Sequence, residues 1–182
     1  MSKSPQGAPS VNLLAVDTAT EGCSAACLTG DKSFERYAVD PQGHSRTLLG
    51  MVEAVLAEAR LEGSALGALA YDAGPGSFTG IRIGAGVAQG LALGLEKPLF
   101  AVSSLMTLAE GVRRDQPGCN SVLAAIDARM DQVYWARLRS DPEAPGHWRW
   151  DEMPCVSEPR EVAANISGCT GVGSGWDRYS DV

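Results

Sequence analysis

Carboxyl and hydroxyl side chains follow the first apolar run of the chain, where a phosphate-handling site would need them. Asp17 ends that run, and Thr18 and Thr20 come directly after it. A carboxylate at this point can hold a magnesium-bound phosphate, and the two hydroxyls can assist it. The same residue types also form Asx-type turns, in which the side chain bonds the backbone two residues further on. On residue types alone, the turn is favoured over the metal–phosphate site.

A glycine-rich turn from Gly74 to Gly80 is the second candidate for chemistry. Gly74 and Gly76 permit backbone conformations or close approaches that a Cβ would block. Ser77 and Thr79 can cap the helix that follows, whose free N–H groups attract anions. The turn satisfies neither phosphate signature, because a dinucleotide fingerprint needs glycine at Thr79 and a P-loop needs a Gly-Lys-Ser/Thr ending. Two interpretations are about equally favoured. The first is a tight turn that packing enforces, and the second is a site for an anion or a partner.

Metal and hydrolase chemistry lack the side chains they need. The two histidines, His44 and His147, are far apart in sequence, and Leu48 stands one helical turn after His44, where a second metal ligand would be required. The sequence has no Gly-x-Ser-x-Gly elbow for a serine nucleophile. We therefore predict no metal site and no catalytic residues. Asp127 and Arg129, at the end of an expected strand, are either a structural ion pair or a partner contact.

Composition limits the partners and the compartment. With 182 residues, 45% of them hydrophobic, the chain is long enough for one domain or two small ones with a sizeable core. A formal net charge of −7 argues against independent nucleic-acid binding. Five cysteines without a C-x-x-C pair favour reduced thiols and a cytoplasmic location. We expect no membrane span, because no run approaches ~20 uninterrupted apolar residues.

Apolar periodicity predicts a mixed α/β fold. Three strands precede any helix, which is typical of a meander at the start of a mixed sheet. Strands are expected over residues 11–16, 24–28, 34–39, 66–71, 99–102, 122–126 and 133–138. Helices are expected over residues 44–61, 77–95, 103–114 and 159–166. The proline-rich stretch 140–159 is predicted to be mostly loop, with a short strand at 148–150.

Two of the expected helices have more apolar surface than one sheet contact needs. On the helix 44–61, Leu49 and Leu56 widen the apolar stripe beyond the ~100° typical of a surface helix. The helix 77–95 is almost entirely Gly, Ala, Val, Ile or Leu, with its polar side chains in a single line. Part of this apolar surface is therefore expected to meet a second helix or another subunit rather than the sheet. The candidate interface residues are Leu48, Leu49, Val52, Leu56, Ile83, Val87 and Leu91.

Four segments together resemble the bacterial TsaB family, also called YeaZ. They are Leu13–Thr20 (LLAVDTAT), Gly74–Gly84 (GPGSFTGIRIG), Ala88–Gly94 (AQGLALG) and Ala124–Ala136 (AAIDARMDQVYWA). The resemblance extends from Val11 to about Trp176 and implies an actin-like, sugar-kinase-like (ASKHA) fold. Such a fold has a ribonuclease-H-like mixed sheet and two related subdomains. The chain departs from the family at Asp131-Gln132, where many relatives have Gly-Glu.

The resemblance also implies a function. TsaB proteins take part in making threonylcarbamoyladenosine beside the anticodon of ANN-decoding tRNAs. They resemble a catalytically silent relative of TsaD, which transfers the threonylcarbamoyl group, and TsaD is one implied partner. A TsaE-type ATPase is another, and a homodimer is implied for the protein alone. The implied interface uses the first two helices. No cofactor is expected, ATP or ADP is possible at the complex interface, and tRNA is reached indirectly.

Two other functions stay open at this point. An actin-like phosphotransferase would use Asp17 to position metal-nucleotide and the turn from Gly74 to Gly80 to contact phosphate. A peptidase is the third possibility, because relatives have been classed with metallopeptidases, but the chain lacks the metal ligands that it would need. TsaD carries two histidines on a helix, and the segment from His44 to Leu48 lacks the second.

The turn at residues 115–118 is the expected boundary between subdomains. It divides the chain into a disordered tail at 1–10, a ribonuclease-H-like subdomain at 11–114 and a second subdomain at 115–182. Family members usually continue for several dozen residues beyond Val182. The second subdomain is therefore expected to be incomplete at its C-terminal end.

Overall fold

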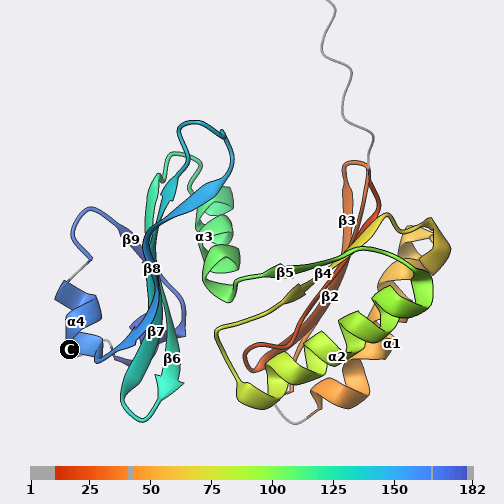
Figure 1. The fold of residues 1–182 in the computed structure, drawn as a ribbon, viewed down its shortest axis with the longest axis horizontal. Helices are drawn as coiled ribbons and strands as arrows, with labels where there is room; N and C mark the ends of the chain where they lie inside the picture. The colour runs from red at the N-terminus through yellow and green to blue at the C-terminus, as the bar shows by residue number, and fades with distance from the viewer. Residues whose placement is uncertain (1–10, 41–42, 165, 180–182) are drawn as a thin grey trace, which may run out of the picture. The chain divides into compact units, whose positions relative to one another are not determined.

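The computed structural model describes residues 11–40, 43–164 and 166–179, which form two units with a sheet each (Figure 1). The first unit contains the described residues up to Ala73 together with Ser77–Ala101, and the second contains Gly74–Gly76 and the chain from Val102 onward. The predicted tail at 1–10 and the predicted incomplete end at Val182 lie outside the described residues.

The first sheet begins with the predicted meander. Its strands are β1 (Leu13–Asp17), β2 (Gly22–Thr29), β3 (Lys32–Val39), β4 (Ala68–Asp72) and β5 (Leu99–Val102). The strand order is β3-β2-β1-β4-β5, in which β1, β2 and β3 are antiparallel and β4 is parallel to β1. A parallel neighbour requires a crossover connection, and a helix between β3 and β4 supplies it.

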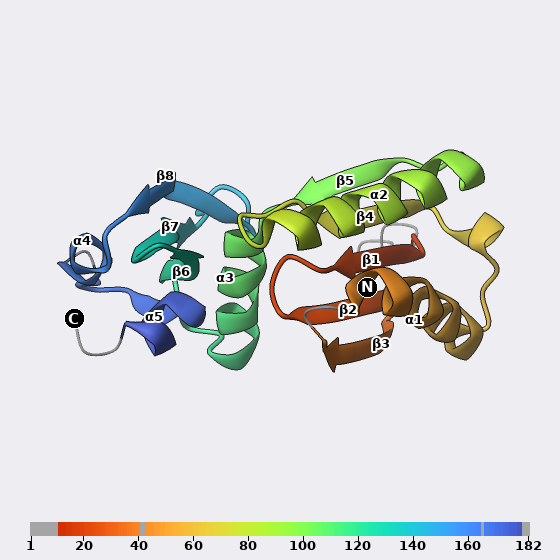
Figure 2. The same ribbon diagram turned by 90° about the horizontal axis from the view of Figure 1, so that it is seen from below.

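Two helices cover one face of this sheet, as Figures 1 and 2 both show. Helix α1 (His44–Ala59) contacts β2 and β3, and α2 (Phe78–Leu95) contacts β4 and α1. Each helix ends at a residue in the left-handed conformation, Arg60 with φ 56° and Glu96 with φ 54°. Both helices are confirmed to within about two residues of the predicted ends.

The second sheet repeats the strand order of the first four strands of the first sheet. Its strands are β6 (Ser121–Arg129), β7 (Gln132–Ser140), β8 (Trp148–Ser157) and β9 (Thr170–Val172). The order is β8-β7-β6-β9, with β6, β7 and β8 antiparallel and β9 parallel to β6. The two units therefore repeat one topology, as expected for two related subdomains.

Three helices accompany the second sheet. They are α3 (Ser104–Asp115), α4 (Pro159–Ala164) and α5 (Ser174–Arg178). Leu105, Ala109 and Val112 of α3 pack in one cluster with β6 residues, so α3 belongs to the second unit. The division therefore falls between Ala101 and Val102, earlier than the expected boundary after α3, because that helix buries its apolar side on the second sheet.

The prediction of loop over most of 140–159 is wrong, because β8 is a strand from Trp148 to Ser157. Pro154 misled it. Proline cannot donate a hydrogen bond to a neighbouring strand, but edge strands and irregular registers tolerate it. β8 is an edge strand, and its register with β7 shifts between the pairs Trp135–Cys155 and Arg137–Glu152, on either side of Pro154. The short elements β9 and α5 were also not predicted.

Candidate functional site

Asp17 lies beside a second carboxylate that the sequence analysis missed. Because β1 and β4 are parallel and in register, Asp17 and Asp72 meet at the carboxyl ends of their strands, where their side chains are hydrogen-bonded. Burial raises the pKa of Asp17. The Ala19 N–H, the charge of His44 and the Asp72 hydrogen bond act in the opposite direction. The two carboxyl groups therefore form a close pair at this edge of the first sheet.

The predicted turn after β1 is present. Asp17 Oδ1 accepts the N–H of Ala19 at 2.8 Å, which is the Asx-type bond that the residue types favoured. Thr20 Oγ1 accepts the N–H of Gly22 at 3.4 Å in the same way. Both side chains therefore shape the connection between β1 and β2.

Thr18 holds α2 against the end of β1. Its side chain is 1% exposed, and its hydroxyl donates to the carbonyl oxygen of Gly80 at 2.8 Å. A Cβ on Gly80 would lie 2.0 Å from the Thr18 carbonyl oxygen, and one on Gly84 would lie 2.6 Å from Thr18 Oγ1. Glycine at these positions thus permits the close packing of helix on strand, which is the structural alternative for this motif.

The rest of the glycine-rich turn divides between the two units. Ser77 is the N-cap of α2, because its Oγ accepts the N–H of Gly80 at 3.2 Å. Thr79 lies in the first turn of the helix and is exposed. Gly74, with φ 93°, and Gly76 belong to the second unit. The hydroxyls of Thr18 and Ser77 are therefore already engaged in hydrogen bonds within the chain.

Over the described ranges, no group of three or more His, Cys, Asp or Glu side chains is placed to hold a metal ion. His44 is buried at the start of α1, with its Nε2 3.4 Å from the carbonyl oxygen of Glu21. Its positive form would stabilise the charge on Asp17.

In the second unit, Asp127 takes the place that Asp17 has in the first, near the end of the first strand. Its carboxylate, 10% exposed, pairs with Arg129 at 3.2 Å and with Arg178 at 3.3 Å. It also accepts the hydroxyl of Tyr179 at 3.3 Å and the backbone N–H of Arg129 at 3.0 Å. The ion pair between Asp127 and Arg129 is thus present, and this carboxylate is surrounded by donors from its own chain.

The predicted interface residues on α1 and α2 differ in exposure. Leu49 is 48% exposed. The prediction is wrong for Leu48 and Val52, which are 0% and 4% exposed and pack in the core of the first unit. They belong to the i, i+3, i+4 stripe that α1 turns toward the sheet. The partly buried members are Leu56, Ile83, Val87 and Leu91.

Helix α2 turns its smallest side chains toward the sheet. The buried positions are Gly80, Gly84, Ala88 and Ala92. Larger side chains are left outside, since Phe78 is 73% and Leu93 is 82% exposed. The guanidinium carbon of Arg82 lies 3.4 Å from the centroid of the Phe78 ring. The sequence analysis missed Phe78 and Leu93. Small residues recur at four-residue spacing along two lines of this helix, 80-84-88-92 and 86-90-94, and spacing alone does not say which line meets the sheet.

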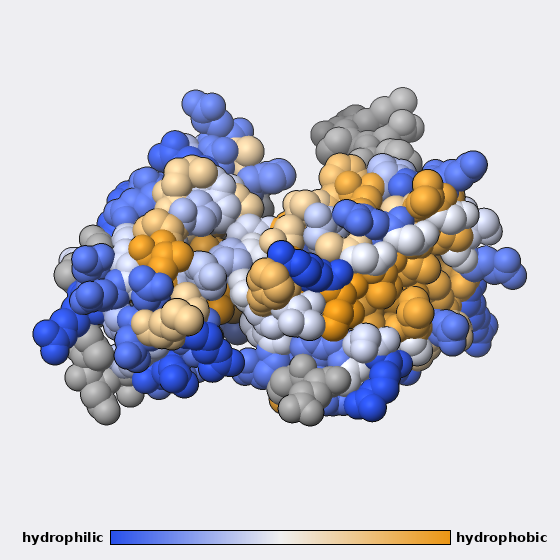
Figure 3. Space-filling model, turned by 60° about the horizontal axis from the view of Figure 1, so that its bottom comes forward, coloured by the Kyte–Doolittle hydropathy of each residue, from blue (hydrophilic) through white to orange (hydrophobic). Residues whose placement is uncertain are grey.

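Hydrophobic residues gather over the part of the first unit formed by α1 and α2 (Figure 3). We call this surface the helix face and define it by Leu49, Leu56, Ile83, Val87 and Leu91. Leu49 is exposed, whereas the other four are partly buried, and Leu56, Val87 and Leu91 also pack against the core. An apolar surface that stays partly accessible is typical of a contact with another protein or with a membrane.

Helix α2 also meets a simple test for a membrane span. It has 18 residues and a mean hydropathy of 1.2, and 22% of it is buried. The sequence analysis expected no membrane span, whereas α2 is long and apolar enough for one by length and composition. Helices in the cores of globular proteins reach the same length and composition. The packing of α2 on β4 and on Thr18 gives this helix a place in the first unit without a membrane.

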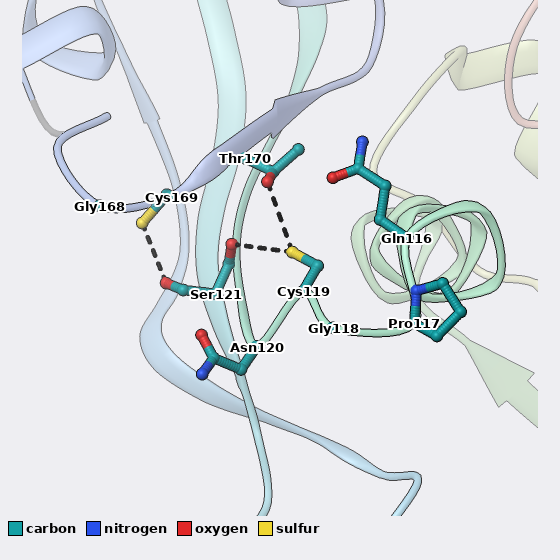
Figure 4. Close-up of a pocket in the computed structure, with 9 residues that line it drawn as sticks. All are labelled: Gln116, Pro117, Gly118, Cys119, Asn120, Ser121, Gly168, Cys169 and Thr170. Atoms are coloured by element: carbon teal, nitrogen blue, oxygen red, sulfur yellow. Dashed lines mark hydrogen bonds between the residues drawn. The ribbon is translucent and has the colours of Figure 1, made fainter.

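A pocket of about 540 Å³ opens in the second unit (Figure 4). Cys119 Sγ lies 3.4 Å from Thr170 Oγ1, and Ser121 Oγ lies 3.0 Å from Cys169 Sγ. The residues that line it have uncharged side chains, and the two thiols, Cys119 and Cys169, contact hydroxyl groups of the same lining. Its lining residues are Gln116, Pro117, Gly118, Cys119, Asn120, Ser121, Gly168, Cys169 and Thr170.

The repeated sheet, with a parallel fourth strand and an aspartate near the end of each first strand, defines the actin-like, sugar-kinase-like class of proteins. The family model described as TsaD, tRNA N6-adenosine threonylcarbamoyltransferase, matches residues 39–144. The TsaB protein of Escherichia coli K12 is 43% identical over 176 residues, covering 94% of this chain and 75% of that protein. The chain belongs to the TsaB (YeaZ) family of tRNA threonylcarbamoyladenosine biosynthesis proteins.

A second relative and two solved structures support the family assignment. The TsaB protein of Haemophilus influenzae is 37% identical over 177 residues, covering 93% of this chain and 75% of that protein. The solved structure of YeaZ from Pseudomonas aeruginosa matches with a TM-score of 0.84 and 42% identity, over 93% of this chain and 79% of that one. A second Pseudomonas aeruginosa structure, described as similar to peptidase YeaZ, has a TM-score of 0.83 and 41% identity, over 93% and 79% of the two chains.

Proposed function

We propose that this protein serves tRNA threonylcarbamoyladenosine synthesis as a non-catalytic subunit that binds a TsaD-type catalytic subunit through the helix face. The observation that carries the proposal is the arrangement of α2, which buries four small residues against the sheet and leaves Phe78 and Leu93 exposed. A helix that needed only its own sheet would place those larger side chains inward, because burying them stabilises the fold by roughly 1.5–3 kcal/mol each.

The candidate catalytic groups support a subunit without chemistry of its own. The Thr18 hydroxyl is bonded to Gly80, and the Asp17 carboxylate accepts the N–H of Ala19. In the second unit, two arginines already pair with Asp127. A phosphotransferase needs such groups free to meet metal-nucleotide, so the phosphotransferase alternative is not favoured.

Exposed glycines on α2 suit a helix–helix contact at this face. Gly86, Gly90 and Gly94 follow one another at four-residue spacing, and a Cβ built on any of them meets nothing within 4 Å. They lie next to Ile83, Val87 and Leu91, which are partly buried at the border between the core and the outward side of α2. A partner helix can therefore approach the α2 backbone closely while it covers the apolar side chains.

The proposal extends to the partners. Without a TsaD-type subunit, the same face pairs with a second copy of this chain, because a two-fold contact can reuse one apolar surface. A TsaE-type ATPase joins the assembly, and this chain needs no cofactor of its own, so any ATP or ADP belongs to the complex interface. The net charge of −7 leaves tRNA binding to the partners. The protein acts in the cytoplasm, where tRNA is modified.

The interface is tested with two substitutions that spare the fold. Leu49→Glu places a charge on the helix face, and Gly90→Leu adds bulk where the chain itself leaves space. Each should weaken co-elution with a TsaD-type subunit at least tenfold, and Leu28→Glu on β2 is the matched control, since Leu28 is 42% exposed. Retention of full binding by both variants would show that another surface makes the contact.

The non-catalytic role needs a separate measurement. Isothermal titration of the isolated chain with ATP and magnesium should show no binding at micromolar concentrations. Tight binding by the isolated chain, followed by phosphate release or transfer, would instead establish the phosphotransferase alternative.

A further inference from the structure

Two arginines lie directly opposite each other on the second sheet. Arg139 of β7 and Arg149 of β8 are paired in the antiparallel register, so their side chains project from the same face of the sheet. Opposite residues of antiparallel strands have Cβ atoms only ~4.5–5.5 Å apart, and like charges at this spacing are destabilising. The pair therefore concentrates positive charge, at a cost in stability, in a chain whose formal net charge is −7.

One carboxylate offsets part of this charge. Asp151 Oδ2 accepts the Nε–H of Arg139 at 2.9 Å, and the terminal N–H groups of that guanidinium are not bonded to any described residue. Arg149 is exposed and makes no hydrogen bond or ion pair with any residue that the structure describes. Two guanidinium groups facing one carboxylate leave one positive charge uncompensated, with N–H donors available for an anion.

A buried hydroxyl continues the row across the sheet. Ser121, the first residue of β6, is paired with Arg139 of β7, so the two side chains share a face. Ser121 is 9% exposed, and its Oγ lies 3.0 Å from the Sγ of Cys169, just before β9. The row therefore runs from Arg149 through Arg139 to Ser121 and Cys169.

The helices on this face of the sheet lie toward its other end. Helix α5 is held at the far end of β6, where Arg178 pairs with Asp127. Helix α4 follows the end of β8, where Ser157 is paired with Val133 at the start of β7. The side chain of Arg139 is 50% exposed, so a ligand can reach the guanidinium groups of the row.

The pocket of the second unit adjoins the row, because Ser121 and Cys169 belong to both (Figure 4). Its volume of about 540 Å³ is in the range of small-molecule sites. The pocket also contains the amide and hydroxyl groups of Gln116, Asn120 and Thr170. Such groups suit a ligand whose body carries hydroxyl groups, and the arginines suit a charged group at one end of it.

We propose that the row and the pocket together bind a small phosphate monoester. Arg139 and Arg149 hold the phosphate, because a guanidinium donates parallel N–H bonds to phosphate oxygens and a dianion balances more than one positive charge. The hydroxyl-bearing body of the ligand lies in the pocket beside Ser121. A phosphodiester of RNA carries one charge per phosphate, and the net charge of −7 opposes a polyanion. The site lies in the second unit and is independent of the helix face.

Titration with a simple phosphate monoester tests the site. The full chain is titrated with ribose 5-phosphate at millimolar concentrations, with inorganic phosphate and ribose as comparison ligands. Ribose 5-phosphate should bind at least tenfold more tightly than inorganic phosphate, because the pocket adds contacts, and ribose should not bind. Absence of ribose 5-phosphate binding, or equal affinity for inorganic phosphate, would overturn the proposal. Tighter binding of an RNA oligonucleotide without a terminal phosphate would also overturn it and assign the row to RNA.

Arg149→Gln locates the binding, because Arg149 has no partner within the described chain to lose. This variant should bind ribose 5-phosphate at least tenfold more weakly, whereas its thermal unfolding midpoint without ligand stays equal or rises, since the repulsion with Arg139 is relieved. Arg160→Gln on α4, also an exposed arginine, is the matched control and should keep binding within twofold. Unchanged binding by Arg149→Gln would overturn the assignment and leave the helix face, which Leu49→Glu tests, unaffected.

Discussion

The hydroxyl of Thr18 donates to the carbonyl oxygen of Gly80 at 2.8 Å, although the two residues lie 62 positions apart in the chain. This bond joins the end of β1 to the first turn of α2, and it uses residues from both motifs that suggested phosphate chemistry. The two motifs thus meet in space because they pack against each other. Their residue types are explained by the geometry of that contact.

The first prediction concerns the glycines of α2. Gly80→Ala would place a Cβ 2.0 Å from the Thr18 carbonyl oxygen, a backbone atom that cannot move alone. We expect the free energy of unfolding to fall by about 3 kcal/mol or more, measured by urea unfolding followed by circular dichroism. Gly86→Ala is the control on the same helix, where nothing lies within 4 Å. It should stabilise the protein by up to about 1 kcal/mol. Equal effects of the two substitutions would refute the packing argument.

Apolar periodicity was sufficient to predict most of the fold. The meander, α1 and α2 follow from strand alternation and helical spacing, and Ser77 was recognised as a cap from its residue type. Sequence patterns did not predict the elements whose conformation depends on tertiary contacts. Pro154 suggested a loop, but an edge strand with an irregular register accommodates it.

The candidate site was less predictable, because its contacts depend on strand order. Asp72 follows an apolar run and looks unremarkable until β4 is known to lie beside β1. Leu48 and Val52 were assigned to the interface because they share an apolar helix with Leu49, and periodicity alone does not say which side of a wide stripe meets the sheet. Phe78 was not predicted to be exposed, because the sequence does not show that α2 buries glycine and alanine rather than its larger side chains.

The second prediction concerns Asp17 and pH. Burial raises the pKa of Asp17, so the folded protein holds the proton more tightly than the unfolded chain does. Between the unfolded and the folded pKa, stability therefore falls as the pH rises. Asp17→Asn should remove this loss, making the protein more stable than wild type at pH 7, with the difference shrinking in acid. Thermal unfolding across the pH range measures it. Asp31→Asn, at an exposed turn, is the control for loss of a surface carboxylate.

The third prediction concerns thiol reactivity. Cys23 and Cys27 on β2 are 0% exposed, and burial raises the pKa of both thiols. Iodoacetamide at pH 7.5 should therefore leave them unmodified until the first unit unfolds. Cys155 is exposed on β8, although partial burial of its thiol raises its pKa, so it should be labelled in the native protein at a rate that grows with pH. Peptide mass spectrometry follows each site, and native labelling of Cys23 would contradict the assigned core.

The last prediction concerns Asp127, whose carboxylate holds the end of β6 to α5. Asp127→Ala would leave Arg129, Arg178 and the Tyr179 hydroxyl without this acceptor. Because the carboxylate is 10% exposed, we expect a loss of about 2 kcal/mol or more in the free energy of unfolding. Tryptophan fluorescence during urea unfolding is the measurement. It reports on the second unit, which contains all four tryptophans, Trp135, Trp148, Trp150 and Trp176.

Asp151→Ala provides the control for Asp127→Ala in the same sheet. Asp151 pairs with Arg139 at 2.9 Å, but its side chain is 30% exposed and that of Arg139 is 50% exposed. An ion pair that is open to solvent contributes less than about 1 kcal/mol, so this variant should unfold close to wild type. If the two substitutions cost the same, then Asp127 is another surface ion pair. The contact between Asp127 and Arg178 would in that case contribute little to holding β6 against α5.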